Sequence, residues 1–353
     1  MTQIHRRERK RLLRDILKGV SRSFYLTLRV LPGPLREPIG LAYLLARAAD
    51  TLADTPVVPP NRRLQYLQCF KTYIASPGAA GGCDEIQFAL RNRLANRDEA
   101  RLLESLPQLF TLFAAQPAAD RERMRQVVTT LTDGMVFDLN TFPAEESGAI
   151  KALQREDELD RYTYLVAGCV GQFWTEMSMV HVAALKHWDQ DALVEKGVRF
   201  GKALQLTNIL RDLPRDLRIG RCYLPRQWLR QYDLSVAQLL EPNNSAHAKP
   251  LLEHGITLAL QHFAAAEAYV LAIPRRCVRL RLAALWPLMI GLETLARLAS
   301  SDHCLDADIS IKVERRRVYA IMLRSALLVL SNTALRRWLV AARGAAHARR
   351  QSG

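Results

Sequence analysis

The sequence lacks the cysteine spacing that marks a zinc site or a disulfide framework. Its six cysteines lie far apart and form no Cys-x-x-Cys pair: Cys69, Cys83, Cys169, Cys222, Cys277 and Cys304. Several of them lie inside apolar stretches, where a free thiol behaves as a small hydrophobic side chain. We therefore expect buried, unpaired thiols and a reducing compartment.

Long hydrophobic runs are also missing. No uninterrupted apolar stretch reaches the roughly 18 residues that a membrane-spanning helix needs. The first part of the chain, about 1–20, is typical of a basic amphipathic helix and not of a hydrophobic signal peptide. These absences predict a cytoplasmic protein, with peripheral contact at a membrane left open.

Glycine-rich phosphate loops and nucleic-acid motifs are absent too. The glycine-rich piece at 78–82 follows no strand and lacks the Lys-Ser/Thr ending of a P-loop. The chain carries 50 Lys and Arg against 35 Asp and Glu, a formal net charge of +15 that suits nucleic acid, an anionic membrane or a phosphorylated substrate. Because the basic residues are spread along the chain without a known motif, we expect no nucleic-acid partner.

Strand signals are nearly absent, since Val, Ile and Thr are scattered among residues that favour helix. We predict helices at approximately 8–20, 21–31, 36–54, 61–75, 98–115, 119–140, 157–185, 188–216, 248–272, 277–300 and 312–345. No linker is long enough to separate two domains. The expected fold is therefore one all-α domain over 1–353, monomeric, with a basic tail at about 338–353.

Two pairs of aspartates are the main chemical signal in the sequence. On a helix, Gln205, Asn208, Asp212 and Asp216 recur at intervals of three and four residues and share one face. Two carboxylates one turn apart repel each other and are costly to desolvate, whereas Mg²⁺ accepts both together with substrate phosphates. For this pair taken alone, a solvated acidic edge beside neighbouring arginines is the better explanation.

The second pair makes the metal interpretation stronger. Asp50 and Asp54 have the same spacing after another apolar helical run, with Arg47 one turn earlier on the same face. Two such helices suit the clamping of a diphosphate through bridging Mg²⁺. Pro214 lies inside the other motif, so we expect that helix to kink or end near Asp216.

Two further segments have both a structural and a functional interpretation. The residues Ser21-Arg-Ser-Phe24 can cap a helix, or hold phosphate oxygens at its N-terminus. Gly168 and Gly171 lie within a helical run that begins near Tyr162, and each costs about 1 kcal/mol relative to alanine. They indicate either close helix packing or room for a long apolar ligand, and Tyr162 is either structural or directed into that space.

Five motifs in this order resemble the squalene/phytoene synthase family of head-to-head prenyl transferases, over about 21–317. They are Ser21-Arg-Ser-Phe24, Tyr43-Leu-Leu-Ala-Arg-Ala-Ala-Asp50-Thr-Leu-Ala-Asp54, the run from Tyr162 to Gly171, the run from Gln205 to Asp216, and Gly220-Arg-Cys-Tyr-Leu-Pro225. The chain is most similar to a bacterial-type squalene synthase without a membrane anchor. It departs from the family pattern at Ala53 and Arg215, where acidic residues are usual.

The resemblance implies an isoprenoid-synthase helical bundle around a central apolar cavity, with a role for each matching residue. The Mg²⁺ ligands would be Asp50, Asp54, Asp212 and Asp216, which serve catalysis together with Tyr162. Diphosphate would contact Ser21, Arg22, Ser23, Arg47, Gln205, Asn208, Arg211 and Arg221. The isoprenoid chain would contact Phe24, Tyr43, Leu44, Val166, Val170 and Leu204. NADPH would contact Asn208, Arg211, Lys312 and Arg315, although the last two can equally be surface charges.

By the same resemblance, two molecules of farnesyl diphosphate condense to presqualene diphosphate, which NADPH reduces to squalene. The alternatives within the family are phytoene, dehydrosqualene or hydroxysqualene as product. A catalytically silent assembly factor with this fold is the alternative outside enzymes, and it would be marked by loss of the motif aspartates.

The C-terminal segment from Val318 through Ser331 to Arg343 is apolar on one face and basic on the other. Core packing followed by a solvated tail explains this pattern. Peripheral membrane contact explains it as well, and would fail if removal of the residues after Arg337 left liposome binding unchanged.

Overall fold

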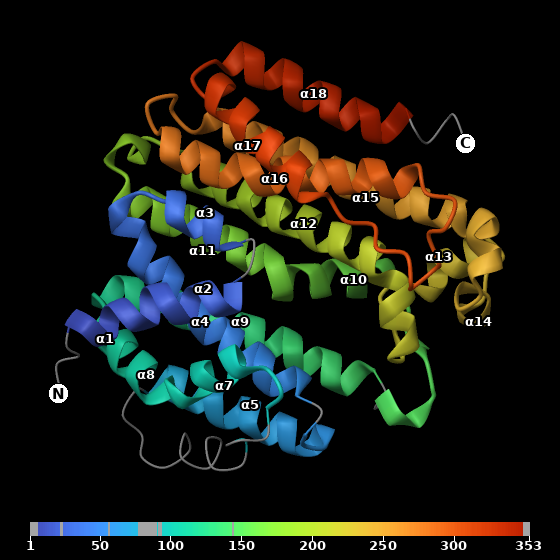
Figure 1. The fold of residues 1–353 in the computed structure, drawn as a ribbon, viewed down its shortest axis with the longest axis horizontal. Helices are drawn as coiled ribbons and strands as arrows, with labels where there is room; N and C mark the ends of the chain where they lie inside the picture. Colours follow the sequence, from blue (N-terminus) through green and yellow to red (C-terminus); the bar gives the residue numbers. More distant parts are fainter. Residues whose placement is uncertain are drawn as a thin grey trace. The chain divides into compact units, whose positions relative to one another are not determined.

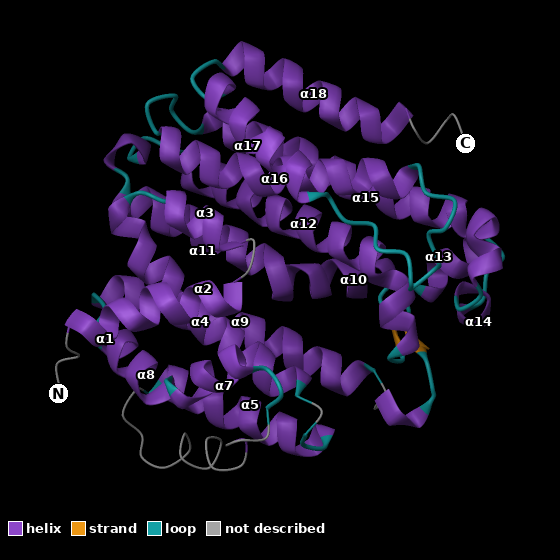
Figure 2. Cartoon of the chain, in the orientation of Figure 1, coloured by secondary structure: helices purple, strands orange, loops and turns teal. Residues whose placement is uncertain are grey.

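The computed structural model describes residues 6–21, 24–55, 57–76, 90, 94–142 and 145–348. The described residues are mostly helical, with only two short strands among them, so the expected all-α class is confirmed (Figure 2). They form two compact units, Met1–Leu139 with Glu176–Ala183 and Asn140–Thr175 with Ala184–Gly353, called unit 1 and unit 2 below. The single-domain organisation stays a prediction.

Unit 1 is built around its longest complete helix, α4 (Gly33–Asp54), which contacts α3, α5, α7 and α8 (Figure 1). The other elements are α1 (Arg6–Lys10), the π-helix η1 (Arg11–Ile16), α2 (Leu17–Ser21), α3 (Phe24–Val30), α5 (Pro60–Ala75), α7 (Arg97–Glu104), α8 (Leu106–Ala114), most of α9 (Ala118–Thr141) and the last part of α11 (Cys169–His181). Proline in the first turn of α4 removes an amide that would have no helical partner. The helix ends before Thr55, whose backbone is extended as expected for a residue preceding proline.

Unit 2 is built around α12 (Gln190–Arg218), which packs against α10, η3, α15 and α16. Its other elements are η2 (Glu145–Ser147), β1 (Lys151–Ala152), α10 (Glu156–Thr163), the π-helix η3 (Tyr164–Gly168), the first part of α11 (Cys169–His181), η4 (Ala183–Leu185) from its second residue, β2 (Arg221–Cys222), α13 (Arg226–Gln231), α14 (Val236–Leu239), η5 (Pro242–Asn244), α15 (Ser245–Ala272), α16 (Val278–Ala299), α17 (Arg315–Leu328) and α18 (Asn332–Ala348). The two strands are parallel, with Lys151 opposite Arg221 and Ala152 opposite Cys222. They were not expected from the sequence.

Glycines bring α12 unusually close to η3 and α11. A Cβ atom on Gly171 would lie 1.9 Å from the carbonyl oxygen of Gly197, and one on Gly201 would lie 2.1 Å from that of Ala167. No side chain larger than hydrogen fits at such separations. Close helix packing therefore explains Gly171, while the π-helical turn Tyr164–Gly168 is a helix irregularity of the kind often found at functional sites.

The helix boundaries differ from the sequence prediction where a long pattern hides a break. The predicted helix at 312–345 is two helices, α17 and α18, and the one at 98–115 is α7 and α8. In contrast, α12 continues through Pro214 and ends at Arg218. Gly220, with φ of 84°, then supplies the left-handed conformation that commonly follows a helix.

Two compositional expectations can be compared with the described residues. Cys69, Cys169, Cys222, Cys277 and Cys304 are free, as expected, while Cys83 lies outside the described residues. The expected burial holds for Cys169, Cys222 and Cys304, whereas Cys69 and Cys277 are only partly buried. One helix, α16, is long and apolar enough to cross a membrane, but 67% of its most apolar window is buried inside the protein. That degree of burial is typical of a core helix in unit 2.

Candidate active site

The first aspartate pair lies on a half-buried face of α4. Tyr43, Arg47 and Asp50 are partly buried along this face, and Asp54 at its end is exposed. Arg47 forms an ion pair with Asp50, and its other guanidinium nitrogen donates a hydrogen bond to Glu99 Oε1 at 2.7 Å. One arginine thus bridges two carboxylates from α4 and α7.

Asp50 is held in an environment that disfavours its charge. Burial and the neighbouring Asp54 carboxylate raise the pKa of Asp50 to about 6, and Arg47 only partly offsets them. A carboxylate crowded in this way gains from a divalent cation, which neutralises both acids at once. The electrostatics of α4 therefore fit the magnesium ligands predicted from the spacing.

The remaining predicted residues of unit 1 have mixed placements. Ser21 is buried and donates its hydroxyl hydrogen bond to the backbone carbonyl of Leu17, and Tyr43 donates to the carbonyl of Val20 at 3.3 Å. Leu44 is fully buried in the core. Arg22 and Ser23 lie outside the described residues, as does the side chain of Phe24. Their predicted contacts with diphosphate or isoprenoid stay predictions.

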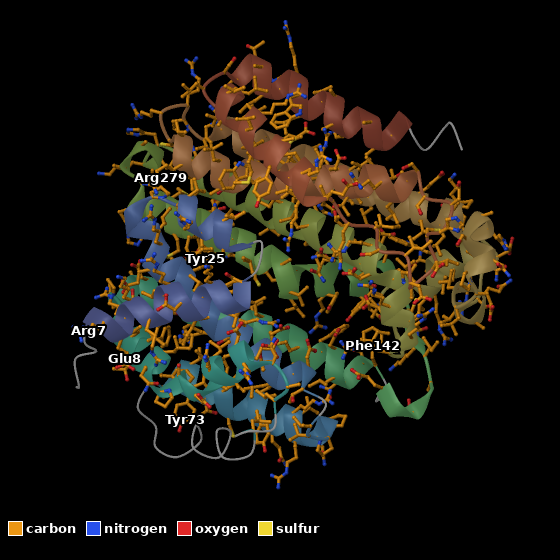
Figure 3. The ribbon with its side chains drawn as sticks, in the orientation of Figure 1. Arg7, Glu8, Tyr25, Tyr73, Phe142 and Arg279 are labelled. Carbon is orange, nitrogen blue, oxygen red and sulfur yellow. The ribbon has the colours of Figure 1, made fainter. Side chains whose placement is uncertain are left out.

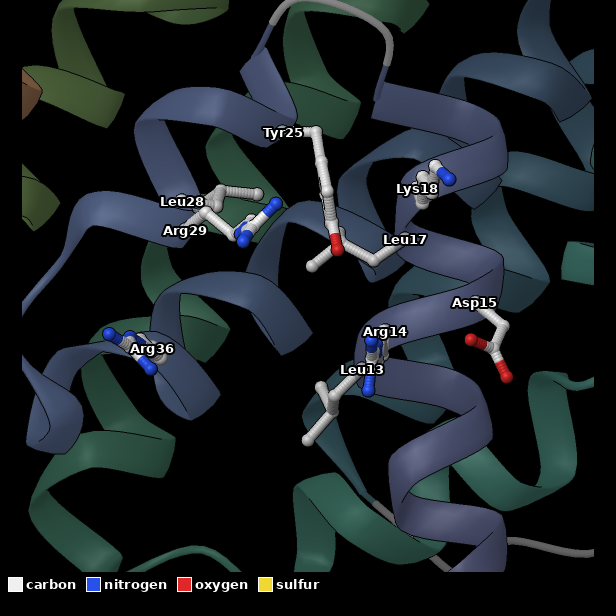
Figure 4. A pocket seen from close by; sticks show the side chains of 9 residues that line it. All are labelled: Leu13, Arg14, Asp15, Leu17, Lys18, Tyr25, Leu28, Arg29 and Arg36. Carbon is white, nitrogen blue, oxygen red and sulfur yellow. The ribbon is translucent and has the colours of Figure 1, made fainter.

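Unit 1 also contains a basic cleft of about 530 Å³ between its N-terminal helices and the start of α4 (Figure 4). The cleft is lined by Leu13, Arg14, Asp15, Leu17, Lys18, Tyr25, Leu28, Arg29 and Arg36. Four of these side chains are cationic and one is acidic, so the cleft has an anion-attracting environment. None of its lining residues was singled out from the sequence.

The second aspartate pair lies on one face of α12 in unit 2, as the helical spacing predicts. Gln205, Asn208, Asp212 and Asp216 are all partly buried. Arg211 forms a two-pronged ion pair with Asp212, in which its Nε donates to Oδ1 at 2.8 Å. Both motifs therefore share one feature, in which the first aspartate is paired with an arginine of its own helix.

A small crevice beside this pair brings in a residue that is distant in sequence. Arg211 and Asp212 line it together with the loop 307–312, which ends with Lys312. The structure thus places Lys312 next to two predicted site residues of α12. Arg315 starts α17, is exposed, and is not among the residues that line the crevice.

Tyr162 is buried in an aromatic cluster. Its ring stacks on that of Tyr223, with centroids 4.7 Å apart, and Tyr223 meets the edge of Phe142 at 5.0 Å (Phe142 is labelled in Figure 3). Tyr223 directly follows β2, whose Arg221 forms an ion pair with Glu145 at 3.6 Å. The stacking fixes the ring of Tyr162 against the segment that carries Arg221.

The predicted apolar contacts of unit 2 lie on neighbouring elements. Val166 is in η3, Val170 in α11 and Leu204 in α12, and all three are partly buried. The glycine contacts described above hold η3 and α11 against α12. These three side chains therefore come from the closely packed part of unit 2.

The donor set of both motifs suits a metal and a diphosphate. Aspartate carboxylates are the ligands that Mg²⁺ uses when it binds substrate phosphates. In the described part of the chain, the buried Nε of Arg47 finds no hydrogen-bond acceptor, which leaves a donor for a phosphate oxygen. No group of three or more described His, Cys, Asp or Glu residues forms a closed metal site by itself. The two pairs belong to different units, so their joint use of one ligand stays a prediction.

Two contacts of this region were not predicted from the sequence. Glu99, which was not singled out, pairs with Arg47 from the first turn of α7, and Tyr223, a member of the fifth motif to which no role was given, stacks on Tyr162. The pair Asn96 and Glu99 has the spacing of a helix start, and Asn96 Oδ1 accepts the amide of Asp98 at 3.0 Å. That signal predicts a helix beginning there but not its contact with Arg47.

The motifs have a counterpart among known proteins. The family model for squalene/phytoene synthase matches residues 17–318, which include every motif described above. The chain belongs to this family. The resemblance drawn from its five motifs is therefore confirmed.

Individual relatives are distant. A squalene synthase from Eremothecium gossypii is 25% identical over 313 residues, which is 88% of this chain and 66% of the relative. A bifunctional lycopene cyclase/phytoene synthase from Arthroderma gypseum is 30% identical over 235 residues, or 65% of this chain and 37% of the relative. The chain thus spans less than two thirds of these relatives. The structure of TcSQS with the ligand E5700 matches with a TM-score of 0.72 at 20% identity, covering 97% of this chain and 99% of TcSQS, which shows the same fold.

Proposed function

We propose that this protein is a squalene synthase that condenses two molecules of farnesyl diphosphate head to head. The observation that carries the proposal is the repeated arrangement of arginine and aspartate, Arg47 with Asp50 on α4 and Arg211 with Asp212 on α12. Each motif offers a carboxylate for a cation and a guanidinium for phosphate oxygens. A non-catalytic assembly role is disfavoured because all four motif aspartates are present.

The chemistry requires that diphosphate leaves while the allylic carbocation meets no water. Mg²⁺ held by Asp50, Asp54, Asp212 and Asp216 would stabilise the negative charge of the leaving group. Arg47 and Arg211, together with Arg22 and Arg221, would bind its oxygens directly. Val166, Val170 and Leu204, with Phe24, Tyr43 and Leu44 of unit 1, would provide apolar surface that excludes water.

Tyr162 would assist proton transfer during formation of the cyclopropyl intermediate, presqualene diphosphate. Its stacking on Tyr223 supports this role, because a fixed ring keeps its hydroxyl in one position. NADPH would supply the hydride that converts the rearranged intermediate to squalene. Lys312 would contact a phosphate of this cofactor next to Arg211, and its position at the crevice supports that assignment. Asn208 and Arg315 are the other proposed contacts.

The direct test is to incubate the purified protein with farnesyl diphosphate and Mg²⁺, with and without NADPH, and to identify the hydrocarbon. Squalene formed only with NADPH supports the proposal. Dehydrosqualene, or hydroxysqualene from capture of water, would identify another member of the family. Phytoene from longer isoprenoid diphosphates is the second candidate, because a relative that is 30% identical carries phytoene synthase in its name.

A separate variant tests the proposed Mg²⁺ ligands. Asp212→Ala is expected to lower turnover at least a thousandfold, since one cation ligand and the partner of Arg211 are lost. Asp157→Ala is the matched control, because Asp157 is 65% exposed, pairs with Arg155 at 2.8 Å and belongs to none of the five motifs. Full activity in the Asp212 variant would contradict the assignment.

A further inference from the structure

The outer face of α17 carries an unusual row of exposed apolar side chains. Tyr319 is 63% exposed, Leu323 69%, Leu327 77% and Leu330, just after the helix, 59%. Their spacing of four, four and three residues puts them on one side of the helix. Of the eight large hydrophobic side chains exposed in the described chain, half belong to this row. We call Tyr319, Leu323, Leu327 and Leu330 the α17 ridge.

The opposite side of α17 is fixed to the protein, so the helix cannot turn the ridge inward. Ile321 and Ser325 are buried there, and Trp286 of α16 donates a hydrogen bond from its indole nitrogen to Ser325 Oγ at 2.8 Å. α17 packs on α16 and α18 in unit 2 (Figure 1). The ridge is therefore a stable feature of the folded surface.

The segment that carries the ridge is basic. The segment 315–348 contains seven arginines and no aspartate or glutamate. Arg317 and Arg343 pair with glutamates at 2.9 and 3.0 Å. Within the described chain the other five have no carboxylate partner: Arg315, Arg316, Arg324, Arg336 and Arg337. Arg316 lies one turn before Tyr319 in line with the ridge, and Arg324 borders it while stacking over Trp338.

We propose that the α17 ridge inserts into the interface of an anionic lipid membrane. An apolar helix face bordered by arginines matches a bilayer, in which acyl chains lie beneath negatively charged headgroups. A second copy of this chain fits less well, because a two-fold contact through the ridge would bring the arginines of two such segments together, and the segment 315–348 contains no carboxylate to pair with them. This proposal does not rest on the proposed enzyme activity.

The packing of the two C-terminal helices indicates that α17, and not α18, makes the proposed membrane contact. Leu335, Trp338 and Leu339 of α18 are buried, and that helix packs against α15 and α16. α18 is therefore part of the packed core of unit 2, and among its described large hydrophobic side chains Val340 is the exposed one. The membrane contact comes from α17, upstream of the basic tail.

The test is co-flotation of the full-length protein with vesicles of phosphatidylglycerol or of phosphatidylcholine. Wild type should bind phosphatidylglycerol vesicles at least tenfold more tightly than phosphatidylcholine vesicles, and salt should weaken the binding to phosphatidylglycerol. Leu327→Ser should lower binding roughly five- to tenfold, and the double variant Leu323→Ser/Leu327→Ser about fiftyfold. The matched control, Leu240→Ser, changes a leucine that is 38% exposed outside the ridge and should bind as wild type does.

The arginine border has a separate test. Arg316→Gln/Arg324→Gln should weaken binding to phosphatidylglycerol about tenfold or more, without affecting the weak binding to phosphatidylcholine. Unchanged melting temperatures would establish that these exposed substitutions leave the fold intact. Equal binding of wild type to both kinds of vesicle, or full binding by the double leucine variant, would overturn the proposal. So would sedimentation that shows a dimer lost in the leucine variants without any binding to vesicles.

Discussion

Removing the charge of Asp50 should stabilise the protein in the absence of metal. Burial and Asp54 raise the pKa of this carboxyl from 3.8 to about 6, so the folded state holds a proton that the unfolded state releases. Between these two pH values Asp50 binds more protons in the folded state than in the unfolded state, so its contribution to the free energy of unfolding falls as pH rises from about 4 to about 6. Above that window, Asp50→Asn no longer carries the cost of the buried charge.

The magnitude follows from the size of the pKa shift and the exposure of the side chain. A shift of about two pKa units corresponds to at most about 3 kcal/mol. The Asp50 side chain is 36% exposed, so solvent screening reduces this, and we expect about 1 kcal/mol above pH 7. In a chain of this length, that raises the melting temperature by about 2 °C.

The assay is thermal unfolding in EDTA at pH 4 and pH 8, repeated with Mg²⁺ and diphosphate. The melting temperature of Asp50→Asn should exceed that of wild type only at pH 8 without metal. Mg²⁺ and diphosphate should raise the melting temperature of wild type more than that of the variant. Asp133→Asn is the control, because Asp133 is a 45% exposed acid of unit 1 that is paired with Lys71. A variant less stable than wild type in EDTA, or equal stabilisation of both proteins by the ligands, would refute the reasoning.

Three other predictions concern unit 2. Gly201→Ala should lower the free energy of unfolding by about 2 kcal/mol, because the added Cβ would lie 2.1 Å from a backbone oxygen. The control Gly344→Ala has open space around it and should be neutral or stabilising, and urea unfolding measures both variants. Burial and the nearby cations Arg199 and Lys202 lower the pKa of His262 to about 4, so the contribution of this histidine to stability is lost as pH falls from 6.5 to 4. His262→Gln should therefore gain stability relative to wild type over this range in urea unfolding, and a constant difference between the two proteins would contradict the assignment. Tyr162→Phe should lower kcat about a hundredfold at unchanged KM and melting temperature, while Tyr223→Phe should keep kcat, as single-turnover kinetics can measure.

The family and its chemical motifs could be recognised from the chain alone, because they depend on local spacing. A helix places residues three and four positions apart on one face whatever surrounds it. The arrangement of Gln205, Asn208, Asp212 and Asp216 on α12, and of Arg47 and Asp50 on α4, therefore follows from their positions along the chain. Helix ends were predicted less well, because the pattern of apolar residues continues across the break between α17 and α18.

Contacts between distant segments were decided only by the tertiary structure. Glu99 reaches Arg47 from another helix, Lys312 comes to lie beside Arg211, and Tyr223 stacks on Tyr162. Their partners are set by packing, which spacing along one helix does not specify. The same holds for the α17 ridge: its sequence shows an amphipathic helix with two faces, and only the packing against α16 determines which of them remains open to solvent.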